Sequence, residues 1–188
     1  MEIQGGLKMN YLYAEQEIKE LSARIRRRRI ITYIVAAPFF ACLVFIFIRH
    51  LSLTYAELGQ DDTLTTLAII AGILGAFVLV FGLSFCVKPL KSYREHIRNS
   101  LCGRTHDIVY NFKRVEPDLS VIDHISFRSV VFDGEPDKHG ITERMFYWDS
   151  LKEIPSFSED EKVHIQYYDR FICGWSREIG QTASENIE

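Results

Sequence analysis

Hydrophobic and polar positions divide the chain into two long apolar runs and a more polar remainder. The first run covers 30–48 and the second covers 64–87, and neither contains a charged residue. Each is close to the ~20 residues that an α-helix needs to cross the ~30 Å hydrocarbon core of a membrane. The pattern therefore predicts a transmembrane hairpin at 30–87, in which 49–63 form the loop between the two helices.

The segment before the hairpin, 1–29, has a helical pattern from about Lys8 to Arg29. Its apolar positions recur at spacings of three and four residues: Tyr11, Ala14, Ile18, Leu21 and Ile25. Such a stripe indicates an amphipathic helix. The stripe suits a helix that lies on the membrane surface or on the protein's own domain. The alternative is a dimerising seam, although fewer than three heptads make a short coiled coil.

The segment after the hairpin, 88–103, is predicted to be a helical linker. Proline is favoured at the first position of a helix, where its missing N–H costs nothing, so we expect Pro89 to open this helix. Gly103 is placed to end it. One apolar face runs through the segment, formed by Leu90, Tyr93, Ile97 and Leu101.

Beyond His106 the pattern changes to the alternation of β-strands. Five short alternating or aromatic segments are separated by turn residues: 108–112, 124–132, 144–148, 163–167 and 171–175. Five strands in about 70 residues favour a small antiparallel barrel, and the long connection before the fourth strand suits an OB-like arrangement. The predicted fold is a membrane α-helical hairpin plus a small, mostly-β, OB-like barrel domain at 104–180. Residues 181–188 are expected to form a disordered tail.

Positive charge lies at one end of the predicted hairpin. Arg26, Arg27, Arg28 and Arg29 precede the first span, Lys88 and Lys91 follow the second, and the loop is acidic. Cytoplasmic flanks of membrane helices are enriched in Lys and Arg. We therefore expect a protein integral to the cytoplasmic (inner or plasma) membrane, with both termini cytosolic and membrane lipid as a partner.

Small residues form a face on the second span. Ala68, Gly72 and Ala76 are four residues apart, with Gly75 beside them, and the first span offers Ala37 and Ala41. Small residues let helices approach closely in lipid. Either the face packs the hairpin on itself, or it forms the contact of a homo-oligomer.

Candidate chemistry is sparse. The closest potential metal group, His96, Cys102 and His106, has no standard ligand spacing, and no nucleophile, phosphate-loop or zinc-protease motif is present. From 99 to 188, ten lysines and arginines face seventeen aspartates and glutamates, a net charge of −7. Phosphate contacts dominate nucleic-acid binding, so an acidic domain argues against that partner. We expect no enzyme, no cofactor, no metal and no nucleic acid.

Four stretches carry a resemblance: Arg144–Asp149, Ile154-Pro155, Glu161–Tyr167 and Phe171–Trp175. With these stretches and its hairpin layout, the chain resembles uncharacterised two-pass bacterial membrane proteins with a small C-terminal β domain. It is also similar in layout to membrane-anchored OB-fold proteins of the NfeD type. A third similarity in layout is to the two-helix, β-barrel effectors of bacterial cyclic-nucleotide antiphage defence, which oligomerise in the inner membrane.

Two functions follow from these expectations. The first is a non-enzymatic membrane protein whose hairpin anchors a cytosolic β domain, used for interaction with an unknown protein partner or for self-assembly. The alternative is a nucleotide-sensing, oligomerising membrane effector of the antiphage-defence type.

Overall fold

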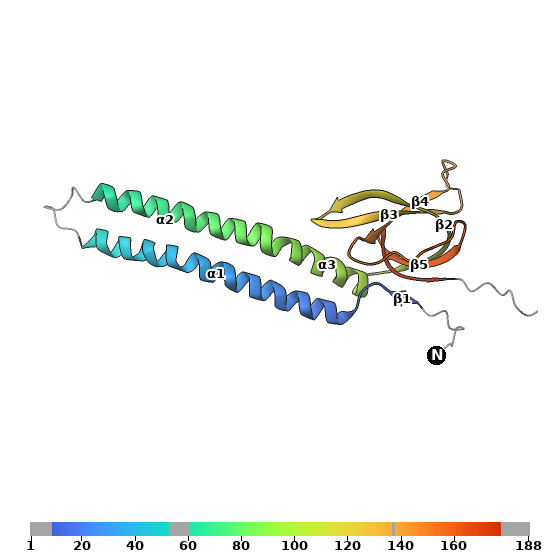
Figure 1. Cartoon of the computed structure of the whole chain (residues 1–188), viewed down its shortest axis with the longest axis horizontal. Helices are drawn as coiled ribbons and strands as arrows, with labels where there is room; N and C mark the ends of the chain where they lie inside the picture. The colour runs from blue at the N-terminus through green and yellow to red at the C-terminus, as the bar shows by residue number, and fades with distance from the viewer. Residues whose placement is uncertain (1–8, 53–60, 137, 178–188) are drawn as a thin grey trace, which may run out of the picture. The chain divides into compact units, whose positions relative to one another are not determined.

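The structure is a computed structural model that describes residues 9–52, 61–136 and 138–177 (Figure 1). The chain forms two compact units. One is the helical hairpin, residues 19–91. The other holds the β-sheet and comprises the described residues of 9–18 and 92–177. The expected tail at 181–188 lies outside the described residues.

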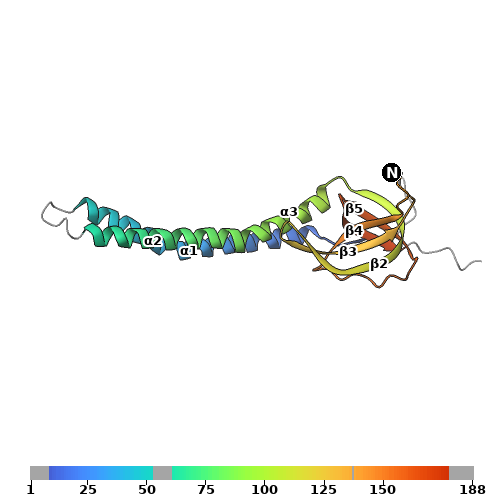
Figure 2. The same cartoon turned by 90° about the horizontal axis from the view of Figure 1, so that it is seen from above.

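Both predicted spans are helical and antiparallel. Helix α1 covers Glu15–Leu51, and α2 covers Asp61–Phe81. The chain then continues as the η2 π-helix Gly82–Val87 and as α3, Lys88–Cys102. Figures 1 and 2 show α1 and α2 side by side. Helix α1 begins at Glu15 rather than near Lys8, because Asn10 and Tyr11 form a strand, β1.

Pro89 is the second residue of α3 and lies in its first turn, and α3 continues the helical stretch of α2 and η2 without a break. Proline has no N–H to donate, and its ring crowds the carbonyl four residues earlier. The turn before it widens into η2, where the Lys88 N–H donates to the Leu83 carbonyl five residues back. A π-helical turn is a common way for a long helix to absorb such a conflict.

All five predicted strands are present, together with β1. Their bounds are β1 Asn10–Tyr11, β2 His106–Ile122, β3 Ile125–Asp133, β4 Glu143–Asp149, β5 Lys162–Tyr168 and β6 Phe171–Arg177. The sheet has the order β1-β6-β4-β3-β2-β5, and β6 also pairs with β5. The pairings are antiparallel except for one parallel pair between β4 and β6, Tyr147 with Phe171. Strands β2 to β5 therefore each have two neighbouring strands, and β6 has three.

A two-residue turn joins β2 to β3. Asp123 and His124 both have positive φ, 50° and 66°, and Ile122 pairs directly with Ile125. Two positive φ values match the twist of the flanking strands in a tight hairpin, and Asp tolerates this conformation better than most residues. The turn fixes the register of the whole β2–β3 pair.

The core of this unit is aromatic and aliphatic. Phe127 and Trp148 are 1% exposed, and Phe132 is fully buried. The rings pack at tilted or edge-to-face angles, for example Phe132 on Phe146 at 5.8 Å between centroids. Phe127 of β3 and the rings of Phe146 and Trp148 in β4 therefore belong to this core. Asp149, which ends that strand, is also fully buried.

The compact unit that holds the sheet also includes helix α3 from Ser92 and the described residues 9–18. Strand β1 pairs with β6, Asn10 opposite Trp175, and the Leu12 N–H donates to the Cys173 carbonyl at 2.9 Å. The unit is thus assembled from chain segments that precede and follow the hairpin.

Candidate functional site

The two helices of the hairpin meet along a line of small and medium side chains. In α1, Thr32 and Ala36 are buried, and in α2 Gly75 is buried. A Cβ added at Gly75 would lie 3.1 Å from the Phe39 Cβ, and one added at Gly82 would lie 2.5 Å from the Thr32 Cγ2. These close approaches allow dispersion contacts along the hairpin.

The small-residue face expected at Ala68, Gly72 and Ala76 is only partly the face that packs. Gly75 makes a close contact, Ala68 is half-buried, and Ala76 is exposed. A Cβ added at Gly72 would meet nothing within 4 Å among the described residues. Ala37 and Ala41 of α1 are exposed as well. Packing within the hairpin therefore does not use Gly72 and Ala76.

The basic residues at the hairpin's end keep their side chains outward. Arg26, Arg27, Arg28 and Arg29 are exposed on α1, and Lys88 and Lys91 are exposed on α3. The Arg28 guanidinium also donates to the Cys86 carbonyl at 3.3 Å. This carbonyl lies in the π-helix η2. Arg28 therefore links α1 to the place where the α-helical hydrogen-bond pattern of the second helix is interrupted.

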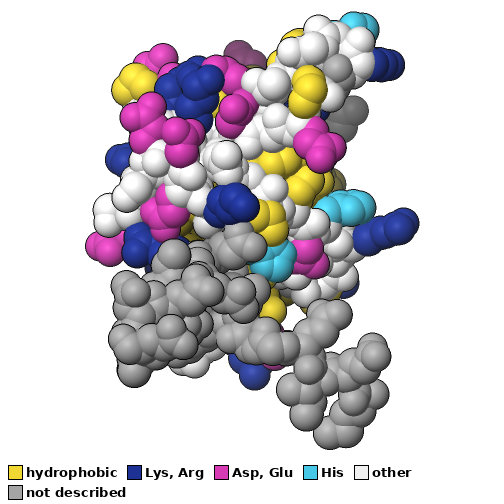
Figure 3. All heavy atoms as spheres, turned by 90° about the vertical axis from the view of Figure 1, so that its right-hand side faces the viewer, with side chains coloured by type: hydrophobic (Ala, Val, Ile, Leu, Met, Phe, Trp, Pro, Cys, Tyr) yellow, Lys and Arg dark blue, Asp and Glu magenta, His cyan; other side chains and the backbone are white. Residues whose placement is uncertain are grey.

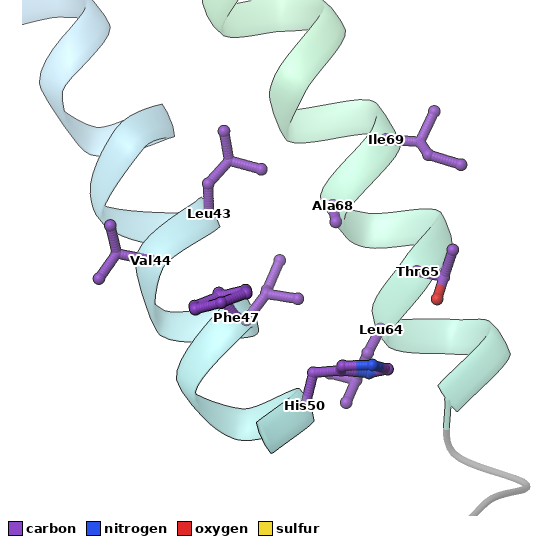
Figure 4. Close-up of a pocket in the computed structure, with 9 residues that line it drawn as sticks. Leu43, Val44, Phe47, His50, Leu64, Thr65, Ala68 and Ile69 are labelled. Carbon is purple, nitrogen blue, oxygen red and sulfur yellow. The ribbon is translucent and has the colours of Figure 1, made fainter. Parts of the chain in front are cut away.

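A cavity of about 610 Å³ lies between α1 and α2 near the loop. Figure 4 shows Leu43 and His50 of α1 pointing toward α2, with Leu64 and Ala68 on the other wall. The lining is almost wholly apolar, apart from His50 and Thr65. The cavity is a side-opening groove of the kind that suits hydrocarbon rather than a polar substrate.

The most connected polar group of the β unit is the buried carboxyl of Asp149. It accepts hydrogen bonds from the Tyr93 hydroxyl at 2.7 Å, the Tyr13 hydroxyl at 3.2 Å and the Leu151 N–H at 2.9 Å. A buried carboxyl requires such donors, since leaving it unpaired would cost several kcal/mol. Tyr13 comes just before α1, and Tyr93 lies on α3. One carboxyl therefore holds both segments that lead to the hairpin.

A second contact fixes the start of α1. The Lys152 ammonium contacts both Glu17 carboxylate oxygens, at 2.8 and 2.9 Å, and lies 5.5 Å from the centroid of the Tyr13 ring. Burial, and then the nearby Asp149, raises the pKa of Tyr13 far above its ordinary value. Burial also raises the pKa of Tyr93. Both hydroxyls therefore remain protonated donors.

His96 connects this cluster to a pocket. Its Nε2 lies 3.0 Å from the Tyr13 hydroxyl, and its ring packs edge-on against Phe127 and Phe171. Burial lowers the pKa of His96, against an opposing effect of Asp149. The pocket has a volume of about 240 Å³. Its lining includes Glu95 and Asp123 but no lysine or arginine among the described residues.

The remaining candidates of the sequence form no site in the part of the chain that the structure describes. No group of three or more His, Cys, Asp or Glu side chains there is arranged to hold a metal ion. Cys42, Cys86, Cys102 and Cys173 are all free thiols. His124 is exposed in the β2–β3 turn, whereas His164 is half-buried, 3.8 Å from the Asp107 carboxylate.

Sequence reasoning missed the Asp149 cluster. An aspartate directly after an aromatic strand reads as the start of a solvated turn, and Tyr13 lies in the predicted N-terminal helix but outside its apolar stripe. The only available signal was Tyr93, a polar-tipped ring on the apolar face of the predicted linker, because buried tyrosines usually find a partner for the hydroxyl.

Comparison with known proteins adds no relative. No protein-family profile, no curated protein sequence and no solved structure matches the chain.

Proposed function

We propose that this chain is a two-pass integral membrane protein whose hairpin anchors a β domain on the cytosolic side, where the domain binds a protein partner or further copies of the chain. The observation that carries the proposal is the outward apolar surface of both helices. In the most apolar stretch of each, only 17% and 11% of residues are buried. A core helix of a water-soluble domain would be largely buried, and exposed apolar surface of this extent suits lipid.

The pairing of β1 with β6 supports an even number of crossings. Residues before α1 and residues after α2 belong to one folded unit. Both therefore lie on the same side of any membrane that the helices cross. The arginines at 26–29 and the lysines at 88 and 91 favour the cytosol for that side.

The strand pairings also support the OB-like barrel. The ring of neighbours β2-β3-β4-β6-β5-β2, with β4 and β6 parallel, corresponds to the five-stranded Greek-key order of an OB-fold. In Figure 2 these strands curl round one another. Barrels of this type commonly serve as binding modules, and the many charges of both signs on the face in Figure 3 suit contact with a polar partner.

The observations favour protein interaction over nucleotide sensing. Phosphate groups are usually bound by Arg, Lys and free backbone N–H groups. The two cavities found beside the β domain's strands are lined instead by Glu95 and Asp123, and by Asp133 and Glu135, without lysine or arginine among the described residues.

Thiol labelling in intact cells tests the topology. A cysteine at Gln60, in the loop, should react with a membrane-impermeant maleimide, whereas the native Cys102, which is exposed in the β unit, should react only after permeabilisation. The background variant replaces the other three cysteines with serine or alanine. The reverse labelling pattern would exclude the cytosolic orientation.

Self-assembly has a separate test at Gly72. Because Gly72 has no close neighbour within the hairpin, Gly72→Leu should leave the monomer folded. If Gly72 lies in a contact between copies, the variant should lose the crosslinked species that the wild type forms in membranes. Wild-type protein that remains monomeric at native abundance would exclude self-assembly and leave binding of a protein partner.

A further inference from the structure

One edge of the sheet has no neighbouring strand over its last residues. Strand β2 pairs with β5 only from His106 to Asn111, but with β3 as far as Ile122. Over Leu119–Ile122, β3 lies on one side, and no described residue pairs with the other. In Figure 1 the β2–β3 hairpin, drawn in yellow, projects beyond the other strands of its sheet. Such an edge presents backbone N–H and C=O groups in strand geometry.

The edge is held rigidly from the inside. Ser120 pairs with Phe127, which is 1% exposed, and Ile122 pairs with Ile125 across the tight turn. The alternate residues face outward: Leu119 is 56% exposed and Val121 is 68% exposed. The edge therefore combines a fixed backbone with two apolar side chains on one face.

The features that usually keep a sheet edge from pairing with another strand are present in β2 before Leu119 but not in Leu119–Ile122. Proteins shield edges with proline, charges and bulges. Pro117 and the register shift between Val115 and Leu119 supply that protection earlier in β2. The four residues Leu119–Ile122 contain neither proline nor charge. They are long enough for a few ladder hydrogen bonds.

Charge selects the kind of partner. Asp118 and Asp123 flank the edge, whereas Glu116 is already paired with Arg114 at 2.8 Å. No lysine or arginine lies between Val115 and His124. A second copy of this strand would bring carboxylates together, which is destabilising. A segment with basic side chains would instead place opposite charges side by side.

We propose that Leu119–Ile122 binds an extended segment of a partner protein by strand addition, and that this segment alternates apolar residues with lysine or arginine. Main-chain hydrogen bonds supply the affinity in this mode, and alternate side chains supply the specificity. The inference rests on the proposed interaction role of the β domain and names the surface and the partner for it.

The test uses the full chain in nanodiscs of uncharged lipid and a short fluorescent peptide of alternating valine and lysine. Its control is the same peptide with alternate backbone nitrogens methylated, which keeps charge and side chains but removes main-chain donors. Fluorescence anisotropy should show binding of the first peptide, at least ~10-fold weaker binding of the second, and similar weakening by Val121→Lys. Equal affinities of the two peptides, or no binding, would overturn the inference.

Leu151→Lys is the matched variant, because Leu151 is 74% exposed in the turn after β4, a strand that does not pair with β2. It adds the same charge and should leave peptide affinity unchanged. If it weakens binding as much as Val121→Lys does, general repulsion explains the result and the edge is excluded. Tryptophan fluorescence of both variants checks that the domain remains folded.

Photo-crosslinkers at Val121 and Leu151 in native membranes separate the two proposals. Crosslinks to other proteins from Leu151 alone, or equally from both positions, would overturn the edge inference but leave the interaction role standing. No crosslinks from either position would count against both. Crosslinks from Val121 alone, together with the effect of N-methylation, are the expected result.

Discussion

The hairpin and the β unit place the same side chains in opposite ways. In the hairpin, large apolar groups face outward, as Phe77 does at 64% exposed, while Ala36 is 2% exposed. In the β unit, Phe127 is 1% exposed, and the surface is charged. In the lipid environment proposed for the hairpin, helices gain by close packing of small residues, because apolar side chains are already in an apolar solvent. In water the gain comes from removing large apolar groups from the surface.

The largest expected effect is the contrast between two phenylalanines. Phe127→Ala should lower the free energy of unfolding of the β unit by about 3–5 kcal/mol, since it removes a buried ring and leaves a cavity. Phe77→Ala removes a ring that faces outward and should leave this value unchanged. Denaturant unfolding of the full chain in detergent, followed by tryptophan fluorescence, measures it, because Trp148 and Trp175 both lie in the β unit.

A loss from Phe77→Ala as large as that from Phe127→Ala would break the comparison. It would mean that the outward ring packs against protein, and that the helix surface is not lipid-facing.

The next effect concerns the polar centre of the β unit. Asp149→Ala should cost about 3 kcal/mol, because the buried Tyr13 hydroxyl and the half-buried Tyr93 hydroxyl would both lose their shared acceptor. The exposed Asp118 gives the control, since Asp118→Ala should change stability by less than about 0.5 kcal/mol. The same fluorescence assay applies. Equal losses of stability in Asp149→Ala and Asp118→Ala would show that the hydrogen bonds of Asp149 to Tyr13 and Tyr93 do not stabilise the β unit.

Within the hairpin, the comparison is between a glycine with a close neighbour on the other helix and a glycine without one. Gly82→Leu would push a side chain against Thr32 and should lower the stability of the helix pair by about 1–3 kcal/mol, whereas Gly72→Leu should not. An SDS titration, followed by energy transfer between dyes at Arg29 and Lys88, reports separation of the helices. Tryptophan fluorescence should stay unchanged in both variants. Identical SDS midpoints would show that the close approach at Gly82 is not needed for packing.

The smallest effect is a dependence of stability on pH through His96. Burial holds the pKa of His96 in the folded chain below the ordinary 6.5. At pH values between this lowered pKa and 6.5, the unfolded chain therefore binds more protons than the folded chain. Stability therefore falls as pH drops below 6.5, and it is fully present above that value. His96 faces Tyr13 and Asp149, with Glu95 beside it in the pocket. Urea midpoints at pH 7.5 and 5 should differ less in His96→Gln than in the wild type.

The two regions also differ in how far sequence predicts them. Span positions follow from composition alone, since a membrane helix must be apolar throughout, and β3 follows from its alternation. The helix face in contact was harder to assign, because small residues lie at both Gly72 and Gly75 and periodicity does not state which one faces the neighbour. The π-helical turn before Pro89 depends on a conflict between backbone groups that leaves no pattern in the side chains.

Strand β1 and the Asp149 cluster were not predicted because both depend on contacts between segments that are far apart in the sequence. Strand β1 has two residues, too few for any alternation, and it exists only because β6 lies beside it. Asp149 becomes buried only when Tyr13 and Tyr93, which are far from it in the chain, cover it. Five strands that each carry their own local signal were predictable, while contacts that join distant segments were not.

The pairing of Asn10 with Trp175 sets an order of events during synthesis. The first strand of the sheet leaves the ribosome before either span, and its partner strand leaves it after both. In a chain that crosses the membrane as proposed, the sheet is completed only after both spans have been made and inserted. If the second span failed to insert, residues 92–177 would be on the opposite side from Tyr13, and Asp149 would lack one of its donors. Under the proposed topology, completion of the β domain depends on correct insertion of the hairpin, and a misinserted chain would be left with an incomplete sheet that proteases can recognise.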